Sequence, residues 1–123
     1  EAVMRACSQI KRKHEDSTWI NEDFVQAYTN LHHLDIAFSI ECYLNEELVG
    51  GLYGLLIGNI FCGESMFAKV TDASKVAFYH LCQQAEENGI KLIDCQVYND
   101  HLASLGAYEI SREKYFEILN ENI

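Results

Sequence analysis

The sequence predicts an α+β domain in which helices cover a mixed β-sheet. Three observations support this prediction. Apolar residues recur at helical spacing near both ends of the chain and in one long central stretch, while two segments between residues 37 and 57 alternate around a short turn. A short apolar segment at residues 91–97 follows the central helix. A strand meander followed by a helical crossover gives a sheet with both antiparallel and parallel neighbours.

The expected elements follow one another as helix, helix, three strands, helix, strand and helix. The second, central and terminal helices each begin after a residue whose side-chain oxygen can accept a backbone N–H, namely Asn21, Asp72 and Ser111. Gly89 ends the central helix. The predicted ranges are a helix at 1–13, a helix after Asn21, strands at 37–43, 48–57 and 60–62, a helix at 73–88, a strand at 91–97 and a helix after Ser111.

The central strand of the meander carries Gly50, Gly51 and Gly54. Glycine weakens a strand unless its missing side chain is used, so these residues predict a bulge or a close approach of another backbone. The turns on either side fall at residues 45–47 and 58–59.

Length and charge limit the class of protein. The chain has 123 residues, enough for one domain with a single core. Its 19 acidic and nine basic residues give a formal charge of −10, which repels phosphate backbones overall and suits a cationic partner. A nucleic-acid ligand would need a local basic patch or another domain. The chain opens on Glu1 directly into a helical pattern, so we expect an N-terminal truncation.

The cysteines and histidines do not suggest a metal site. The five cysteines are odd in number and include no CxxC pair, and the five histidines have no partner at ligand spacing. Buried thiols of this kind behave as small apolar side chains, which predicts a reduced, cytoplasmic protein. No run of 18 apolar residues occurs, so we expect no membrane span.

Polar residues interrupt two apolar segments, and the first interruption contains Glu64. It follows a strand and a glycine, which places the carboxylate near a strand end, where it could bind an ammonium or guanidinium group. The alternative is a structural carboxylate that local N–H groups, Lys69 or Lys75 satisfy.

The second interruption places Asp94 and Gln96 in the predicted strand at 91–97. Residues two apart on a strand project from the same face, so the carboxylate and the amide are expected side by side. They could share a ligand, or they could be a buried polar pair that only fixes packing.

Apolar and aromatic residues flank these polar positions. Phe61, Met66 and Ile93 could line a pocket, and the flexible Met side chain would adapt to aliphatic and aromatic guests. Ordinary core packing is the alternative for all three. Trp19 and Tyr28 could stack on a base, although a lone aromatic residue on a helix is usually core.

Three blocks of sequence together resemble the leucyl/phenylalanyl-tRNA–protein transferases. They are YGLLIGNIFCGESMFAKVTDASKVAF at 53–78, LIDCQV at 92–97 and HLASLGAYEISR at 101–112. Shorter matches at residues 18–20, 27–32 and 48–51 extend the resemblance in order over the whole chain. The succession of GESMF, DASK, DCQ and HLASLGA is specific.

The resemblance implies that residues 1–123 form a GNAT-like aminoacyltransferase domain that lacks its N-terminal region. Such an enzyme moves Leu or Phe, and less well Met, from its tRNA to proteins with N-terminal Arg or Lys and so marks them for degradation. Aminoacyl-tRNA is then a co-substrate and no cofactor or metal is implied. By the same resemblance, Asp94 and Gln96 belong to the reaction centre, and Glu64 contacts the acceptor or the terminal adenosine. Phe61, Met66 and Ile93 line the pocket for the amino-acid side chain. Trp19 and Tyr28 match family positions near the site.

Two other classes of function compete with this one. A non-catalytic homologue would bind cationic N-termini through Glu64 and Asp94 and transfer nothing. An acyl-CoA-dependent N-acetyltransferase would carry a glycine-rich pyrophosphate loop before the central helix. Residues 68–75 contain no glycine, which counts against the acetyltransferase.

Overall fold

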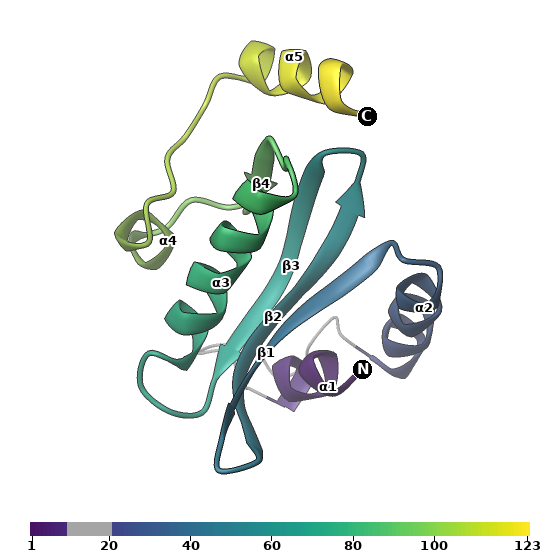
Figure 1. Ribbon diagram of the computed structural model, residues 1–123, viewed down its shortest axis with the longest axis vertical. Helices are drawn as coiled ribbons and strands as arrows, with labels where there is room; N and C mark the ends of the chain where they lie inside the picture. Colours follow the sequence, from purple (N-terminus) through teal and green to yellow (C-terminus); the bar gives the residue numbers. More distant parts are fainter. Residues whose placement is uncertain (10–20) are drawn as a thin grey trace.

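The computed structural model describes residues 1–9 and 21–123, and it shows helices flanking a mixed four-stranded sheet (Figure 1). The strands lie in the order β1-β2-β3-β4, with two antiparallel pairs followed by a parallel pair of β3 with β4. The predicted α+β class and mixed sheet are therefore confirmed. The elements are α1 (Ala2–Gln9), α2 (Glu22–His33), β1 (Ala37–Leu44), β2 (Glu47–Ile57), β3 (Ile60–Ala68), α3 (Ala73–Glu87), β4 (Leu92–Asp94), α4 (Asp100–Ser104) and α5 (Arg112–Asn122).

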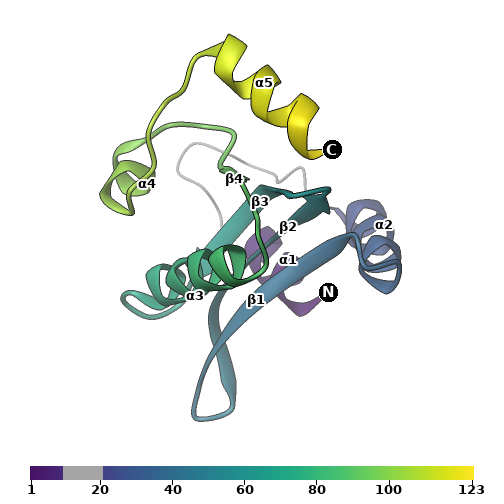
Figure 2. The same ribbon diagram turned by 45° about the horizontal axis from the view of Figure 1, so that its top comes forward.

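Helices cover both faces of the sheet, with α3 on one face and α1 on the other (Figure 2). Neighbouring residues of β2 point to opposite faces. Leu52 packs with Phe61 and the apolar residues of α3, whereas Tyr53 packs with Phe67 and the buried side of α1. The core therefore has two layers with the sheet between them.

The glycines of β2 allow close packing, as predicted. A Cβ atom on Gly50 would lie 2.5 Å from the Cβ of Ala73 in α3, and one on Gly51 would lie 2.6 Å from the Ile40 carbonyl oxygen. The β1–β2 turn has positive φ at both Asn45 and Glu46, as a tight type I′ hairpin requires.

The predicted caps are confirmed at two helices and wrong at the third. The side chains of Asn21 and Ser111 accept backbone N–H groups of α2 and α5. Asp72 precedes α3 but has φ of 66° and makes no side-chain cap. A capping side chain needs extended backbone at this position, and Asp72 instead lies 3.3 Å from the Lys75 ammonium. Gly89 follows the end of α3 with φ of 72°, as expected.

Two strand ends and one helix differ from the prediction. β3 continues through Ala68 instead of ending near Cys62, β4 ends at Asp94, and the short helix α4 was not predicted. The predicted end of the first helix at 10–13 lies outside the described residues. None of the helices in the described part of the chain is long and apolar enough to cross a membrane.

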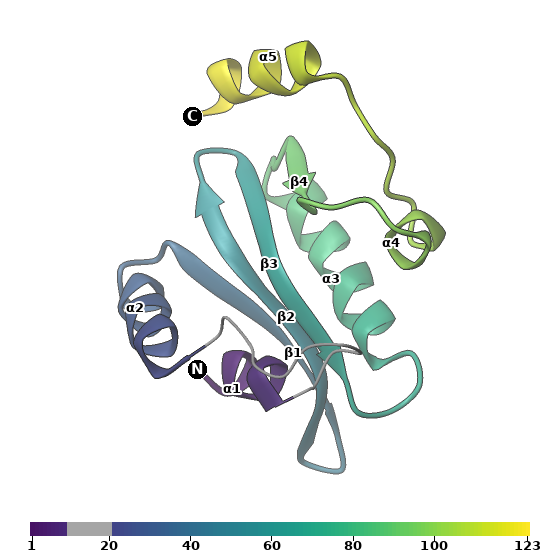
Figure 3. The ribbon, with the colours of Figure 1, turned by 180° about the vertical axis from the view of Figure 1, so that it is seen from behind.

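The terminal helix α5 stands away from the body of the molecule (Figure 3). None of its residues is buried. Its C-terminal end meets the β2–β3 turn, where the Asn59 N–H donates to the Asn122 carbonyl oxygen at 2.8 Å. Gly58 makes this approach possible, because a Cβ atom there would collide with the same carbonyl.

Candidate active site

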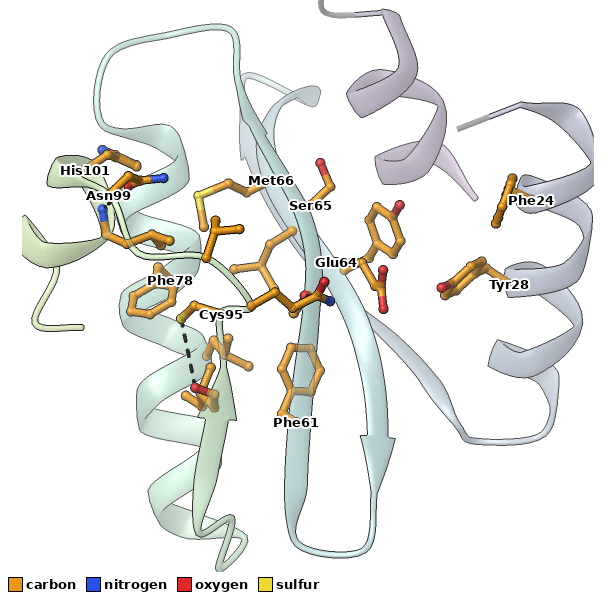
Figure 4. Close-up of a pocket in the computed structure, with 18 residues that line it drawn as sticks. Phe24, Tyr28, Phe61, Glu64, Ser65, Met66, Phe78, Cys95, Asn99 and His101 are labelled. Carbon is orange, nitrogen blue, oxygen red and sulfur yellow. Dashed lines mark hydrogen bonds between the residues drawn. The ribbon is translucent and has the colours of Figure 1, made fainter. Parts of the chain in front are cut away.

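A cavity of about 650 Å³ opens beside β3, where β4 ends and leaves it. The two parallel strands pair only from Ile60 with Leu92 to Cys62 with Asp94. Beyond this point the chain turns away toward α4, and the free side of β3 becomes one wall of the cavity. Figure 4 shows side chains from β3, α2, α3 and the β4–α4 connection around this space.

Glu64 occupies a β-bulge within β3. Tyr53 pairs with Ser65 while the next residue, Gly54, pairs with Gly63, so Glu64 is the extra residue. The predicted strand end at Glu64 is therefore wrong, because β2 is long enough to keep pairing beyond the polar cluster. A bulge redirects a side chain, and the half-buried Glu64 carboxylate points toward Tyr28 on α2 (Figure 4).

The surroundings of Glu64 favour its protonated form. Burial raises the pKa of the Glu64 carboxyl, hydrogen bonding to Tyr28 and Gln96 opposes this shift, and the charge of Asp94 adds to it. The predicted alternative partners do not hold it: Lys75 pairs with Asp72, and no ion pair of the described residues includes Glu64. The carboxylate therefore has hydrogen-bond partners and no cationic partner in the part of the chain described, which leaves it able to receive a cation.

Gln96 lies in a sharp turn instead of a strand. Its φ is 66°, an uncommon value for a residue other than glycine, and the Val97 N–H donates to the Cys95 carbonyl oxygen at 2.7 Å. The Asp94 Oδ1 atom accepts the Gln96 backbone N–H at 2.8 Å. Asp94 therefore stabilises the turn that ends β4, and uncommon backbone of this kind is often found at functional sites.

The side chains of Asp94 and Gln96 point in different directions, so the prediction of a shared strand face is wrong. Gln96 Nε2 donates to the Gly63 carbonyl oxygen at 2.7 Å and lines the first cavity. Asp94 does not line that cavity. Its Oδ2 atom accepts the Tyr115 hydroxyl of α5 at 2.6 Å, and this bond raises the pKa of Tyr115 to about 12.

A second cavity of about 850 Å³ lies on the other side of the β4–α4 connection and is lined by Asp94 and Tyr115. Gln96 belongs to the walls of both cavities. The connection is thus a partition with an open space on each side.

The apolar residues expected in a pocket all line the first cavity. Phe61 is buried, and Met66 and Ile93 are half-buried beside Leu52 and Phe78. Tyr28 also lines it and contacts the Tyr53 ring edge to face, with centroids 5.7 Å apart. Trp19 lies outside the described residues.

Other residues of the cavity were not predicted. Phe24 lies one helical turn before Tyr28, and that spacing could have indicated it. His101 belongs to a block that the sequence marked without a role, and Asn99 caps α4 by accepting the Leu102 N–H at 2.8 Å. Phe78 had only the general signal of an apolar helix face.

The nearby cysteines are unsuited to act as nucleophiles. Burial raises the pKa of Cys62 and of Cys95, and the negative charge of Asp94 adds to both shifts. Both thiols are therefore held in the protonated form, which is a weak nucleophile. Among residues 1–9 and 21–123, no group of three or more His, Cys, Asp or Glu could hold a metal ion.

These residues give the cavity an apolar floor and a polar rim. The floor can receive an apolar group, and the rim offers a carboxylate, a phenol and an amide at Glu64, Tyr28 and Gln96. The rim can bind a cationic group and orient a nitrogen nucleophile. It contains no activated nucleophile of its own among the described residues.

Comparison with known proteins gives one consistent result. The family model for leucyl/phenylalanyl-tRNA protein transferase matches residues 1–120. Proteins named leucyl/phenylalanyl-tRNA–protein transferase are 51% identical over 117 residues in Flavobacterium johnsoniae and 47% identical over 123 residues in Teredinibacter turnerae. A third, from Hahella chejuensis, is 53% identical over 117 residues.

The matches cover nearly all of this chain and about half of each relative. They include 95%, 100% and 95% of the chain, against 55%, 48% and 50% of the three relatives in the order given. The chain thus spans about half the length of the curated relatives it matches. On the family model and these identities, the chain belongs to the leucyl/phenylalanyl-tRNA–protein transferase family.

Proposed function

We propose that this chain carries the catalytic site of an enzyme that moves Leu or Phe, and less well Met, from aminoacyl-tRNA to the N-terminal Arg or Lys of a protein. The observation that carries the proposal is an apolar cavity whose rim holds a half-buried carboxylate without a cationic partner among the described residues. The apolar cavity fits the transferred side chain, and the carboxylate at its rim fits a cationic acceptor. The names of the relatives agree with the transferred residues.

The proposal includes a GNAT-like domain over residues 1–123. Its support is an antiparallel meander, the α3 crossover and a parallel fourth strand that leaves its neighbour at the cavity. In this proposal, transfer of Leu or Phe marks the acceptor proteins for degradation. The proposed location is the cytoplasm, where charged tRNA is made. The chain is acidic overall, with a formal charge of −10. We therefore assign much of the tRNA binding to sequence outside this chain.

The transferred side chain is assigned to the apolar floor. Phe61, Met66 and Ile93 surround a space that is open toward the rim. Met66 can change rotamer to accommodate either a branched aliphatic group or a flat ring. This flexibility accounts for the use of both Leu and Phe.

The proposed reaction is aminolysis of an ester. The neutral α-amine of the acceptor attacks the aminoacyl carbonyl carbon, a C–N bond forms and the C–O bond to the ribose breaks. A proton of the amine is transferred to the departing ribose oxygen, which leaves as a hydroxyl. An α-amino group titrates near pH 8, so part of it is neutral at pH 7. No covalent enzyme intermediate and no cofactor is required. Holding the two substrates together supplies much of the acceleration.

Gln96 is proposed to orient the attacking amine. Its neighbours, the Gly63 carbonyl and the Glu64 carboxylate, are acceptors, so its amide nitrogen faces them and its Oε1 atom is left for the substrate. An amide is a very weak base, so Oε1 accepts a hydrogen bond from the amine without removing the proton. Asp94 acts through the backbone of Gln96 and places a negative charge near the nitrogen as it becomes positive.

Glu64 and Tyr28 are proposed to receive the acceptor. A guanidinium or ammonium group beside Glu64 would favour the charged carboxylate that burial disfavours. For Trp19, the family resemblance supports only the proposal that it belongs near the site. The alternative ligand of this rim, by the family resemblance, is the terminal adenosine of the tRNA.

The test is transfer of radiolabelled Leu from charged tRNA to three peptides that differ only in beginning with Arg, Lys or Glu. It is run with the full-length protein and with residues 1–123 alone. Labelled product with Arg and Lys, and none with Glu, is expected from the full-length protein. Binding of the Arg peptide without product would indicate a non-catalytic homologue and overturn the proposal, as would equal use of the Glu peptide.

A further inference from the structure

Helix α5 is hydrogen-bonded to the candidate site through the side chain of Tyr115. The Tyr115 hydroxyl donates to Asp94 Oδ2 at 2.6 Å, and Tyr115 is half-buried in a helix that has no buried residue. A backbone hydrogen bond at Asn122, by the β2–β3 turn, holds the C-terminal end of this helix. This limited contact argues that the Tyr115 bond does more than complete a hydrophobic core.

The two oxygens of Asp94 hold two different elements. Oδ2 accepts from Tyr115, and Oδ1 accepts the backbone N–H of Gln96 at 2.8 Å. The last side-chain torsion of Asp is broad, so one hydrogen bond leaves the carboxylate free to rotate. A second bond on the opposite oxygen fixes its plane. Asp94 thus links the Gln96 turn to Tyr115, 21 residues further along the chain from Asp94.

We propose that Tyr115 is a positioning residue for aminoacyl transfer: from α5 it fixes the Asp94 carboxylate, which holds the Gln96 turn at the wall between the two cavities. This inference rests on the proposed function, because it assigns Tyr115 a role in that reaction. Tyr115 touches neither substrate in this scheme. It acts on the rate of the bound complex and has little effect on the affinity for either substrate.

The chain offers a matched control. Tyr43 also donates to a carboxylate, Glu41, at 2.7 Å, but it lies on β1 and lines neither cavity. Tyr115→Phe and Tyr43→Phe each remove one phenolic hydroxyl and one hydrogen bond of the same kind. Of the two, only Tyr115→Phe removes a hydrogen bond to Asp94.

The first experiment measures steady-state Leu transfer by the full-length protein carrying either substitution. Tyr115→Phe is expected to lower kcat about 10-fold, as loss of one charge-assisted hydrogen bond predicts, while KM for tRNA and peptide changes less than about 2-fold. Tyr43→Phe leaves both constants unchanged. Equal kcat values in the two variants would overturn the inference.

A double-mutant cycle with Asp94→Asn separates positioning from a general effect on the fold. If Tyr115 acts through Asp94, adding Tyr115→Phe to Asp94→Asn lowers the rate less than about 2-fold further. Independent, multiplied losses would contradict the inference.

Amide hydrogen exchange tests the same contact without activity. The Gln96 N–H is expected to exchange about 10-fold faster in Tyr115→Phe than in Tyr43→Phe. If the unaltered protein transfers nothing, the proposed function fails, and the exchange result still decides whether Tyr115 holds the turn. Equal exchange in the two variants would refute that part.

Discussion

Replacing Glu64 with Gln removes the charge at the rim and keeps the shape of the side chain. An acceptor cation that meets this carboxylate loses a charge-assisted hydrogen bond worth about 1.5–3 kcal/mol. Glu64 is half-buried, so solvent screens part of this energy and the lower figure applies. At 1.4 kcal/mol for each factor of ten, KM for an Arg-starting peptide should rise roughly 10-fold.

The same substitution that weakens peptide binding is expected to stabilise the fold at neutral pH. Burial raises the pKa of Glu64, so the folded protein binds this proton more tightly than the unfolded chain does. The stability that this group contributes is fully present below the unfolded pKa and is lost as pH rises through the folded pKa. Glu64→Gln cannot lose a proton, so its stability relative to the unaltered protein should increase between pH 4 and pH 7.

Two measurements check this prediction together. Peptide KM comes from steady-state transfer at fixed charged tRNA, and the free energy of unfolding comes from urea titrations at both pH values. Glu87→Gln, an exposed change at the end of α3, is the matched control and should alter neither. An unchanged KM with Glu64→Gln, or a variant that becomes relatively less stable at pH 7, would refute the assignment of Glu64 as a carboxylate kept for a ligand.

Two further changes test the floor and the turn. Met66→Ala should lower kcat/KM for Leu about 10-fold through lost apolar contact, with a smaller loss for the larger Phe. Competition between the two charged tRNAs measures both losses. Equal losses would argue against Met66 as part of the side-chain pocket. Gln96→Gly relieves the positive φ of 66° but removes the hydrogen bond to the Gly63 carbonyl, so the free energy of unfolding should change by less than about 1 kcal/mol. Transfer should fall about 100-fold, because the amide is lost. Undiminished transfer would show that the amide has no role.

Local chemistry made much of the fold predictable. The cap at Asn21 and a turn at residues 45–47 follow from residue type within a few positions; the cap was confirmed, and the turn occupies residues 45–46. The close approach at Gly50 was also predictable, because glycine in a strand has few other uses. The cap at Asp72 was wrong because the backbone at that position is left-handed; Asp tolerates both this conformation and the extended one of a cap, so residue type does not choose between them.

The geometry of the site was less predictable than its composition. The bulge at Glu64 depends on how β3 pairs with β2, and pairing register is set by the whole sheet. Gln is not a residue type that favours positive φ, so its turn gave no local signal. The contact between Tyr115 and Asp94 joins distant segments and has no periodic pattern to reveal it. The apolar residues Phe61 and Met66 were easier, because both flank the polar cluster directly.

The most direct test of the proposed chemistry is a single-turnover transfer of Leu by full-length protein carrying Asp94→Asn. Asn keeps an oxygen for the Gln96 N–H and converts one charge-assisted bond to Tyr115 into a neutral one, which costs about 1 kcal/mol of stability. The matched control is Asp35→Asn, an exposed position with φ of 60° that Asn readily adopts. We predict transfer at least about 100-fold slower in Asp94→Asn and unchanged in Asp35→Asn. Equal rates in both variants would contradict the central claim that Asp94 organises this site for aminoacyl transfer.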